Sequence, residues 1–226
     1  MKNKIAKITL VAGFILVWAL VFSCSSGDDL DSIEPGDSSS SIGGGSLSYQ
    51  GKTYRTMKIG YQTWMAENLN YKVSGSRCYD DEEAHCDKYG SLYNWATANT
   101  VCPSGWHLPS NADWNKLFHY VDGTSNTEEP YSSETAGKLL KATSGWKVYK
   151  GKSGNGEDKY GFSAIPGGHG NASGSFSNIG GYGGWWSSSE YNDEEAYNRI
   201  MYYNYDSADY DYDDKLLMLS VRCVKD

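Results

Sequence analysis

Four histidines, five cysteines and a run of three serines are the residues of this 226-residue chain whose types could do chemistry. The histidines lie far apart in the sequence, without the short spacing typical of metal ligands. His107 lies in a Trp-His-Leu-Pro turn, where we expect a hydrogen-bonded structural residue. The serine run, residues 187–189, lacks the G-x-S-x-G pattern of a strained nucleophile. These residues predict neither a histidine metal centre nor a serine hydrolase.

Carboxylates are most crowded in residues 206–214. Asp209, Asp211 and Asp213 offer the oxygen ligands that Ca²⁺ prefers, but their spacing is not that of an EF-hand loop. The sugar-chelating signatures of calcium-dependent lectins are also missing from the sequence. We interpret the run as a solvated acidic loop, with these three aspartates kept as weak calcium candidates. We expect no cofactor.

Tyrosine and tryptophan crowd into residues 182–212, beside glycine-rich loops. Aromatic rings that carry a hydroxyl or indole donor suit stacking on sugars or contact with a partner protein. Side chains alternate along a strand, so one of Trp185 and Trp186 must point inward, and strand packing is the competing interpretation for every member of the group. The ligand-binding candidates are Tyr182, Trp185, Trp186, Tyr203 and Tyr205.

The cysteine count is odd, which in a secreted protein leaves one cysteine to be explained. If Cys24 carries a lipid, four remain, and three pairings into two disulfides are open. Their wide and uneven spread argues against a zinc site, and an oxidising compartment favours disulfides. The four are Cys78, Cys86, Cys102 and Cys223.

The N-terminal residues 1–23 have the form of a targeting signal. Three lysines precede an apolar run over residues 8–22, shorter than the ~20 residues that a spanning helix needs. Its end at Ser23 and Cys24 resembles a bacterial lipoprotein signal, in which the cysteine is lipidated and becomes the new N-terminus. An uncleaved signal anchor is the alternative. Serines rather than an aspartate follow Cys24, and the sorting known from some bacterial lipoproteins then implies the outer membrane.

Composition divides the rest of the chain into a tether and one domain. Residues 24–46 are rich in serine and glycine and cannot bury enough apolar surface to fold. They predict a tether with a reach of roughly 25 Å, or a glycosylated stalk. The domain is predicted over residues 47–226. The net charge of −8 becomes −11 without the three lysines of the signal, so a nucleic-acid partner is not expected.

The predicted elements of the domain place helices in its first half and strands in its second, as in an α+β fold. Ser110 and Asp113 form a capping box before an apolar stripe at helical spacing, and Gly123 ends that helix. Two further helices are expected over residues 89–98 and, with Ser133 as cap, 134–141. Strands are expected over residues 47–49, 53–59, 160–165, 184–188, 196–205 and 216–224.

Several strings taken together, spanning roughly residues 49–226, resemble the Fibrobacter succinogenes major paralogous domain family. That family is known mainly as a surface and secreted module without an established reaction. The resemblance therefore constrains fold and location more than function. The strings are QTWMAENL (62–69), YGSLYNW (89–95), CPSGWHLPS (102–110), GFSAIPGG (161–168), WWSSSE (185–190) and SVRCV (220–224).

At the level of fold, the Gly-Trp-His-Leu-Pro-Ser string and the closing Ser-Val-Arg-Cys-Val strand are similar to the C-type lectin-like and formylglycine-generating-enzyme-like superfamily. The resemblance implies small antiparallel sheets, two or three flanking helices, long glycine-rich loops and pairing of the N- and C-terminal strands. It also implies disulfides between Cys102 and Cys223 and between Cys78 and Cys86. The oxidase reaction is not expected, because Cys223 has no close cysteine neighbour.

Three functions remain open from the sequence. The first is a lipid-anchored cell-envelope protein with a non-catalytic extracytoplasmic module that binds a polysaccharide or surface protein in adhesion. The second is an enzyme of the same fold with a site that the sequence does not reveal. The third is a purely structural envelope protein. We favour the first, with the membrane, through the lipid, as a further partner.

Overall fold

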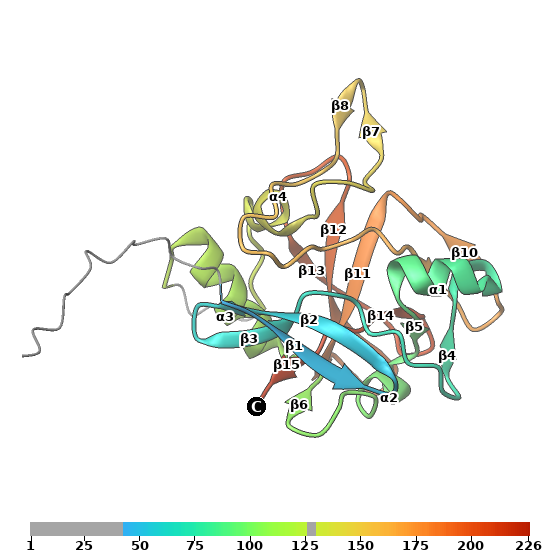
Figure 1. Ribbon diagram of the computed structural model, residues 1–226. Coiled ribbons are helices and arrows are strands. Elements are labelled where there is room, and N and C mark those ends of the chain that lie inside the picture. The colour runs from blue at the N-terminus through green and yellow to red at the C-terminus, as the bar shows by residue number, and fades with distance from the viewer. Residues whose placement is uncertain (1–42, 126–129) are drawn as a thin grey trace, which may run out of the picture. The chain divides into compact units, whose positions relative to one another are not determined.

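The computed structural model describes residues 43–125 and 130–226, which form two larger, mostly antiparallel sheets with short helices around them (Figure 1). The strand orders are β1-β2-β3-β15-β6 and β13-β12-β11-β14-β5-β4. Two small two-stranded sheets, β7–β8 and β9–β10, complete the set, and β7–β8 projects from the rest in Figure 1. The strands are β1 (Gly44–Tyr49), β2 (Lys52–Ile59), β3 (Gln62–Met65), β4 (Ser76–Arg77), β5 (Leu92–Tyr93), β6 (Trp106–His107), β7 (Val148–Tyr149), β8 (Lys152–Ser153), β9 (His169–Gly170), β10 (Phe176–Ser177), β11 (Tyr182–Glu190), β12 (Glu195–Tyr202), β13 (Asp209–Asp214), β14 (Leu219–Ser220) and β15 (Val224–Lys225).

The first sheet joins the two ends of the domain. Gln50 and Gly51 have φ of 49° and 77°, the positive values that a tight two-residue hairpin turn between β1 and β2 requires. The C-terminal β15 pairs antiparallel with β3, Val224 opposite Trp64, and with β6. The predicted strand pair is confirmed, with β1 starting earlier, at Gly44. The resemblance implied pairing of the N- and C-terminal strands; β1 and β15 lie in one sheet, but β15 pairs with β3 and β6 and not with β1.

The second sheet is built on the long strands β11, β12 and β13, which follow one another antiparallel. They account for the strands predicted at 184–188 and 196–205. The strand predicted at 216–224 is instead divided: β14 pairs with β11 in this sheet, and β15 belongs to the first sheet. One C-terminal segment therefore ties the two sheets together.

The strand predicted over residues 160–165 was wrong. Only Ala164 makes a bridge there, with Lys141. Gly161 and Ser163 have φ of 68° and 52°, which lie outside the extended region that a strand needs. The segment runs as a loop that packs against the core through Phe162.

The helix α3 (Asn111–Asp122) forms as predicted. The Ser110 hydroxyl accepts a hydrogen bond from the Asp113 amide, and the Asp113 carboxylate accepts one from the Ser110 amide. Gly123 ends the helix with a φ of 65°. The predicted third helix is shorter, α4 (Ala136–Leu140), and the Ser133 hydroxyl accepts from the Ala136 amide at its start.

The single helix predicted over residues 89–98 was also wrong. The chain forms α1 (Glu83–Tyr89), then β5, then α2 (Trp95–Ala98), with a 3-10 turn η1 (Tyr79–Asp81) before them. Gly90 ends α1 with a φ of 80°, and a Cβ there would lie 2.7 Å from the side chain of Asn68. Asn94 restarts a helix by accepting from the Thr97 amide. The helical spacing of the apolar residues did not predict that one helix ends at Gly90 and another begins after Asn94.

Two disulfides, Cys78–Cys86 and Cys102–Cys223, close the fold with the pairing that the resemblance implied. The second joins the segment before β6 to the segment before β15. Elements of this kind, small sheets with few short helices, confirm an α+β fold. Within residues 43–125 and 130–226, no helix is long and apolar enough to cross a membrane. The predicted signal and most of the tether lie outside the described residues.

Candidate functional site

Trp185 and Trp186, both predicted to bind a ligand, belong to the core, so that prediction was wrong. Each is 0% exposed. The strand β11 is central in its sheet and covered on both faces, so alternation buries both rings. The Trp185 indole N–H donates to Asn68 Oδ1, and that of Trp186 donates to the Tyr93 carbonyl. Their indole donors have internal partners.

Asn68 and Arg222 form a buried polar network with Trp185 and Ser220, which we call the Asn68–Arg222 network. The Asn68 amide nitrogen donates to the Tyr89 carbonyl at 2.9 Å and to Ser220 Oγ at 3.2 Å. Its oxygen accepts from Trp185 and from the Arg222 guanidinium, both at 2.9 Å. One amide thus makes all four hydrogen bonds of which it is capable.

The Arg222 guanidinium also donates to two carbonyls, those of Phe162 and Ser163, and lies over the Phe162 ring. Burial lowers the pKa of this guanidinium to about 9. No carboxylate in the described residues pairs with it, so carbonyl and amide oxygens hold the charge. The network links the second sheet, through Trp185 and Ser220, to the segment after β3 and to the loop of residues 161–168.

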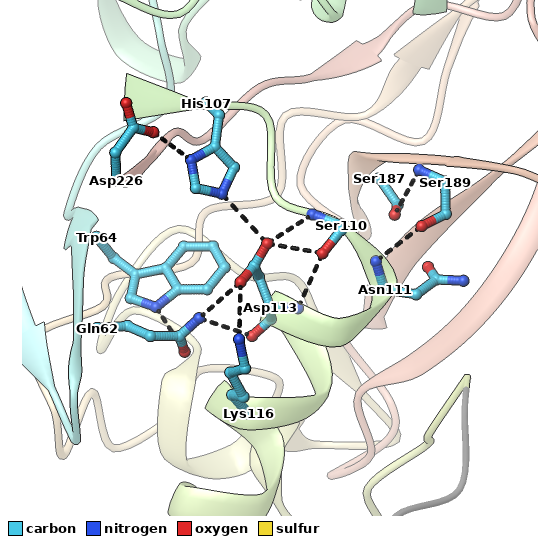
Figure 2. Close-up of polar contacts among 10 residues, drawn as sticks. All are labelled: Gln62, Trp64, His107, Ser110, Asn111, Asp113, Lys116, Ser187, Ser189 and Asp226. Carbon is cyan, nitrogen blue, oxygen red and sulfur yellow. Dashed lines mark hydrogen bonds and ion pairs between the residues drawn. The ribbon is translucent and has the colours of Figure 1, made fainter. Parts of the chain in front are cut away.

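A second group, the His107–Asp113 cluster, looks catalytic by composition but is not arranged for nucleophilic attack (Figure 2). His107 lies between two carboxylates, with Nε2 3.2 Å from Asp113 and Nδ1 2.6 Å from Asp226. The Ser110 hydroxyl donates to Asp113 and not to the imidazole, so no base is positioned on it. Asp113 has a lowered pKa, since hydrogen bonds from Ser110 and His107 outweigh its burial. The cluster caps α3, consistent with the structural role expected for His107.

The serine run also serves the backbone. Ser189 Oγ accepts from the Asn111 amide at 3.0 Å, and Ser187 Oγ accepts from the Ser189 amide (Figure 2). The Ser189 hydroxyl therefore joins the end of β11 to the start of α3, whereas that of Ser187 bonds within β11.

A different site lies where β9, β11, β12 and β13 meet, and we call it the tyrosine–aspartate pocket. It holds about 160 Å³, room for about five waters at roughly 30 Å³ each. That is enough for part of one sugar ring. Sequence reasoning had selected Tyr182, Asp211 and Asp213, and had missed the others. The lining residues are His169, Asn178, Tyr182, Tyr202, Asp211, Asp213 and Leu217.

The aspartates reach the pocket because β13 alternates. In the sequence DYDYDD, Asp209, Asp211 and Asp213 share one face of the strand. The pKa of Asp213 is raised, first by burial and then by the charge of Asp211, while a hydrogen bond from the Asn198 amide opposes both. No ion pair in the described part of the chain includes these three carboxylates.

These aspartates are not a ready-made calcium site. No group of three metal-binding side chains forms within residues 43–125 and 130–226. The interpretation as a loop was wrong as well, since residues 209–214 form the edge strand β13.

Tyr182 supplies the most distinctive feature of the pocket. Its side chain is 6% exposed, yet its hydroxyl has no hydrogen-bond partner among the described residues. The ring is held edge-to-face between His169 and Tyr202, with centroids 5.3 Å from each. Burial, then the charges of Asp213 and other neighbours, raise the pKa of this hydroxyl well above its usual value. A Cβ at Gly184 would lie 2.5 Å from the hydroxyl, so glycine there leaves room for it.

The remaining predicted ligand-binding residues, Tyr203 and Tyr205, lie in different surroundings. Tyr205 is 59% exposed and lies edge-to-face with Tyr202, at 6.3 Å, beside the pocket. Tyr203 is half-buried and packs on Tyr149 and the core, away from it. The missed Tyr202 is directly opposite Tyr182 in the β11–β12 register, which sequence alone did not supply.

His169 is the other residue that sequence reasoning passed over, because it was tested only for metal-ligand spacing. Its Nε2 lies 3.3 Å from the Asn178 amide nitrogen, and burial lowers the pKa of the ring. It therefore lines the pocket as a neutral imidazole at neutral pH.

Comparison with known proteins gives one match. The model of the Fibrobacter succinogenes major domain matches residues 57–225. No curated protein and no solved structure matches the chain. The match covers most of the chain, including the second sheet, the Asn68–Arg222 network and the pocket, and it begins within β2 of the first sheet. On this evidence the chain belongs to the Fibrobacter succinogenes major domain family.

Proposed function

We propose that this protein is a lipid-anchored cell-envelope protein whose domain is a non-catalytic binding module for carbohydrate, used in surface adhesion. The observation that carries the proposal is the tyrosine–aspartate pocket, with the Tyr182 hydroxyl, which makes no hydrogen bond among the described residues, at its wall. A ligand hydroxyl that hydrogen-bonds to it would contribute about 0.5–1.5 kcal/mol to binding.

The chemistry of the lining suits a sugar. Asp211 and Asp213 are acceptors, the Asn178 amide and the Tyr182 hydroxyl can donate, and Leu217 adds an apolar wall. Sugar hydroxyls both donate and accept, so this mixed set matches them. The exposed ring of Tyr205 beside Tyr202 adds a face for stacking.

The absence of catalysis is part of the proposal and rests on what the candidate nucleophiles already do. Ser110 is committed to its cap, and Ser187 and Ser189 to backbone amides. His107 is held between two carboxylates. None of these groups faces the pocket.

For the fold we propose the C-type lectin-like class. Support comes from the pairing of β15 with β3 and β6, the two sheets, and the Cys102–Cys223 disulfide that fixes the closing strand.

The carbohydrate proposal is tested by a glycan-array screen followed by titration calorimetry. Tyr182→Phe removes only the unpaired hydroxyl and is expected to weaken binding about 5- to 10-fold, the value of one hydrogen bond. Tyr61→Phe is the matched control, because Tyr61 is fully exposed on the β2–β3 turn. Retention of no glycan by the wild-type domain would overturn the proposal.

The anchor is a separate part of the proposal. Two disulfides support an oxidising, extracytoplasmic location. Several acyl chains on Cys24 would give stable anchoring, at ~0.8 kcal/mol per buried CH₂, and we propose the outer membrane as the site. Cys24→Ala is expected to abolish fatty-acid labelling and membrane partitioning and to leave the domain folded. Equal detergent partitioning of both proteins would restore the signal-anchor alternative.

A further inference from the structure

The charge of the tyrosine–aspartate pocket is unbalanced. Asp211 and Asp213 line it, and Asp209 lies on the same face of β13. No lysine or arginine lines the pocket in the described residues, and burial keeps His169 neutral. A neutral sugar would satisfy hydrogen bonds there without relieving the repulsion between the carboxylates.

A protonated amine would form hydrogen bonds in the pocket and would also relieve the repulsion between the carboxylates. An ammonium group brings one positive charge and three N–H donors, which pair with carboxylate oxygens. The rings of Tyr182 and Tyr202 lie edge-to-face at the same place, and a cation is attracted to the faces of such rings. The Tyr182 hydroxyl, which makes no hydrogen bond among the described residues, offers one more oxygen.

The rest of the lining distinguishes an amino sugar from a lysine side chain. The exposed Asn178 amide, which pairs with the His169 ring through one N–H, has a second N–H to donate, and the Tyr182 hydroxyl makes no hydrogen bond among the described residues. A sugar ring carries hydroxyls next to its amine that can pair with both groups, whereas a lysine chain presents only methylene groups there.

We propose that the pocket binds amino sugars through their protonated amine, held between Asp211 and Asp213. This names the carbohydrate class of the proposed function and rests on it. The amine sits against β13, and the ring hydroxyls face Asn178 and Tyr182.

Three tetrasaccharides with the same backbone test the proposal by titration calorimetry at pH 7 in EDTA. They are β-1,4-linked glucosamine, N-acetylglucosamine and glucose, which differ at one substituent. The glucosamine oligomer is expected to bind at least 10-fold more tightly than the other two. Asp213→Asn and Asp211→Asn are expected to reduce that preference to less than 3-fold. Asp193→Asn removes the same charge from the exposed β11–β12 turn and should keep it.

The outcomes separate the two proposals. Binding of all three oligomers with equal affinity overturns the amine proposal and leaves carbohydrate binding in place. Binding of none overturns carbohydrate binding itself. A glucosamine preference that survives both pocket variants would place the binding site elsewhere and overturn the proposal. Competition by tetralysine as strong as that by the glucosamine oligomer would show that the pocket binds any cation, which also overturns it. Loss of glucosamine binding in EDTA, restored by Ca²⁺, would also overturn it.

Discussion

The Asn68–Arg222 network and the tyrosine–aspartate pocket are both polar clusters of one domain, but the network is buried, whereas the pocket is lined by exposed and partly buried side chains around Tyr182. In the network, one amide uses its full hydrogen-bonding capacity, and a buried cation is shared among three oxygens, with only its Nε left without a hydrogen bond among the described residues. In the pocket, two like charges lie beside a tyrosine hydroxyl that has no partner among the described residues. A satisfied network rigidifies a fold, whereas an unsatisfied one leaves interaction energy for a ligand.

The two regions also differ in their relation to the family strings. Asn68, Ser163, Trp185 and Arg222 each belong to one of the strings that resemble the family. The pocket residues Tyr182, Tyr202, Asp211 and Asp213 lie outside all of them. The strings therefore describe the framework, and we expect chains that share them to share the fold while their pockets differ in ligand.

The largest expected effect comes from the disulfide that closes the framework. Replacing Cys102 and Cys223 together by serine removes a cross-link between residues 121 apart in the sequence. In the chain-entropy model this is expected to lower the unfolding free energy by roughly 5 kcal/mol. The same replacement of Cys78 and Cys86, with a separation of 8, should cost about 2–3 kcal/mol. Urea unfolding of both double variants measures the difference, and a larger loss from the short loop would contradict it.

Asn68→Ala is expected to lower the unfolding free energy by about 3–5 kcal/mol. It leaves the Trp185 indole, the Ser220 hydroxyl and the Tyr89 carbonyl without this partner and removes one oxygen from the buried Arg222 charge. Asn99→Ala, on the exposed end of α2, is the control and should cost under about 1 kcal/mol. Equal losses in thermal unfolding would show that the network is not central.

Tyr182→Phe should separate binding from stability. Its hydroxyl makes no hydrogen bond in the described residues, so the expected change in unfolding free energy is within about 0.5 kcal/mol. The affinity loss proposed above should therefore appear without a change in melting temperature. A destabilisation near that of Asn68→Ala would assign the hydroxyl to the framework instead.

A further small effect has the opposite sign. The folded-state pKa of Asp213 is raised, so the folded protein holds this proton more strongly than the unfolded chain. Stability from this group is present below the unfolded pKa, 3.8, and is lost as pH rises through the higher folded value. Asp213→Asn is expected to stabilise the unliganded protein by about 0.2–1 kcal/mol at pH 7. A melting temperature at pH 7 below that of the wild type would contradict it.

Local signals predicted the capped helix α3, because Ser110, Asp113 and Gly123 act within their own segment. The resemblance supplied the disulfide pairing. Neither the local signals nor the resemblance predicted the register between strands. Tyr202 lies opposite Tyr182 only because of how β11 pairs with β12. The burial of Trp185 and Trp186 likewise depends on β11 being covered on both faces. The sequence near β11 does not show this, because the covering residues come from distant parts of the chain.

The strand β13 lies at the edge of its sheet and carries an aspartate at four of its six positions. An unpaired edge is a template on which a second copy can add a strand, and charged side chains are a common protection against this. The carboxylates that face the pocket therefore also disfavour the pairing of this edge with a neighbouring molecule. A family member that exchanged them for apolar residues to accept a different ligand would gain that specificity together with a tendency to self-associate.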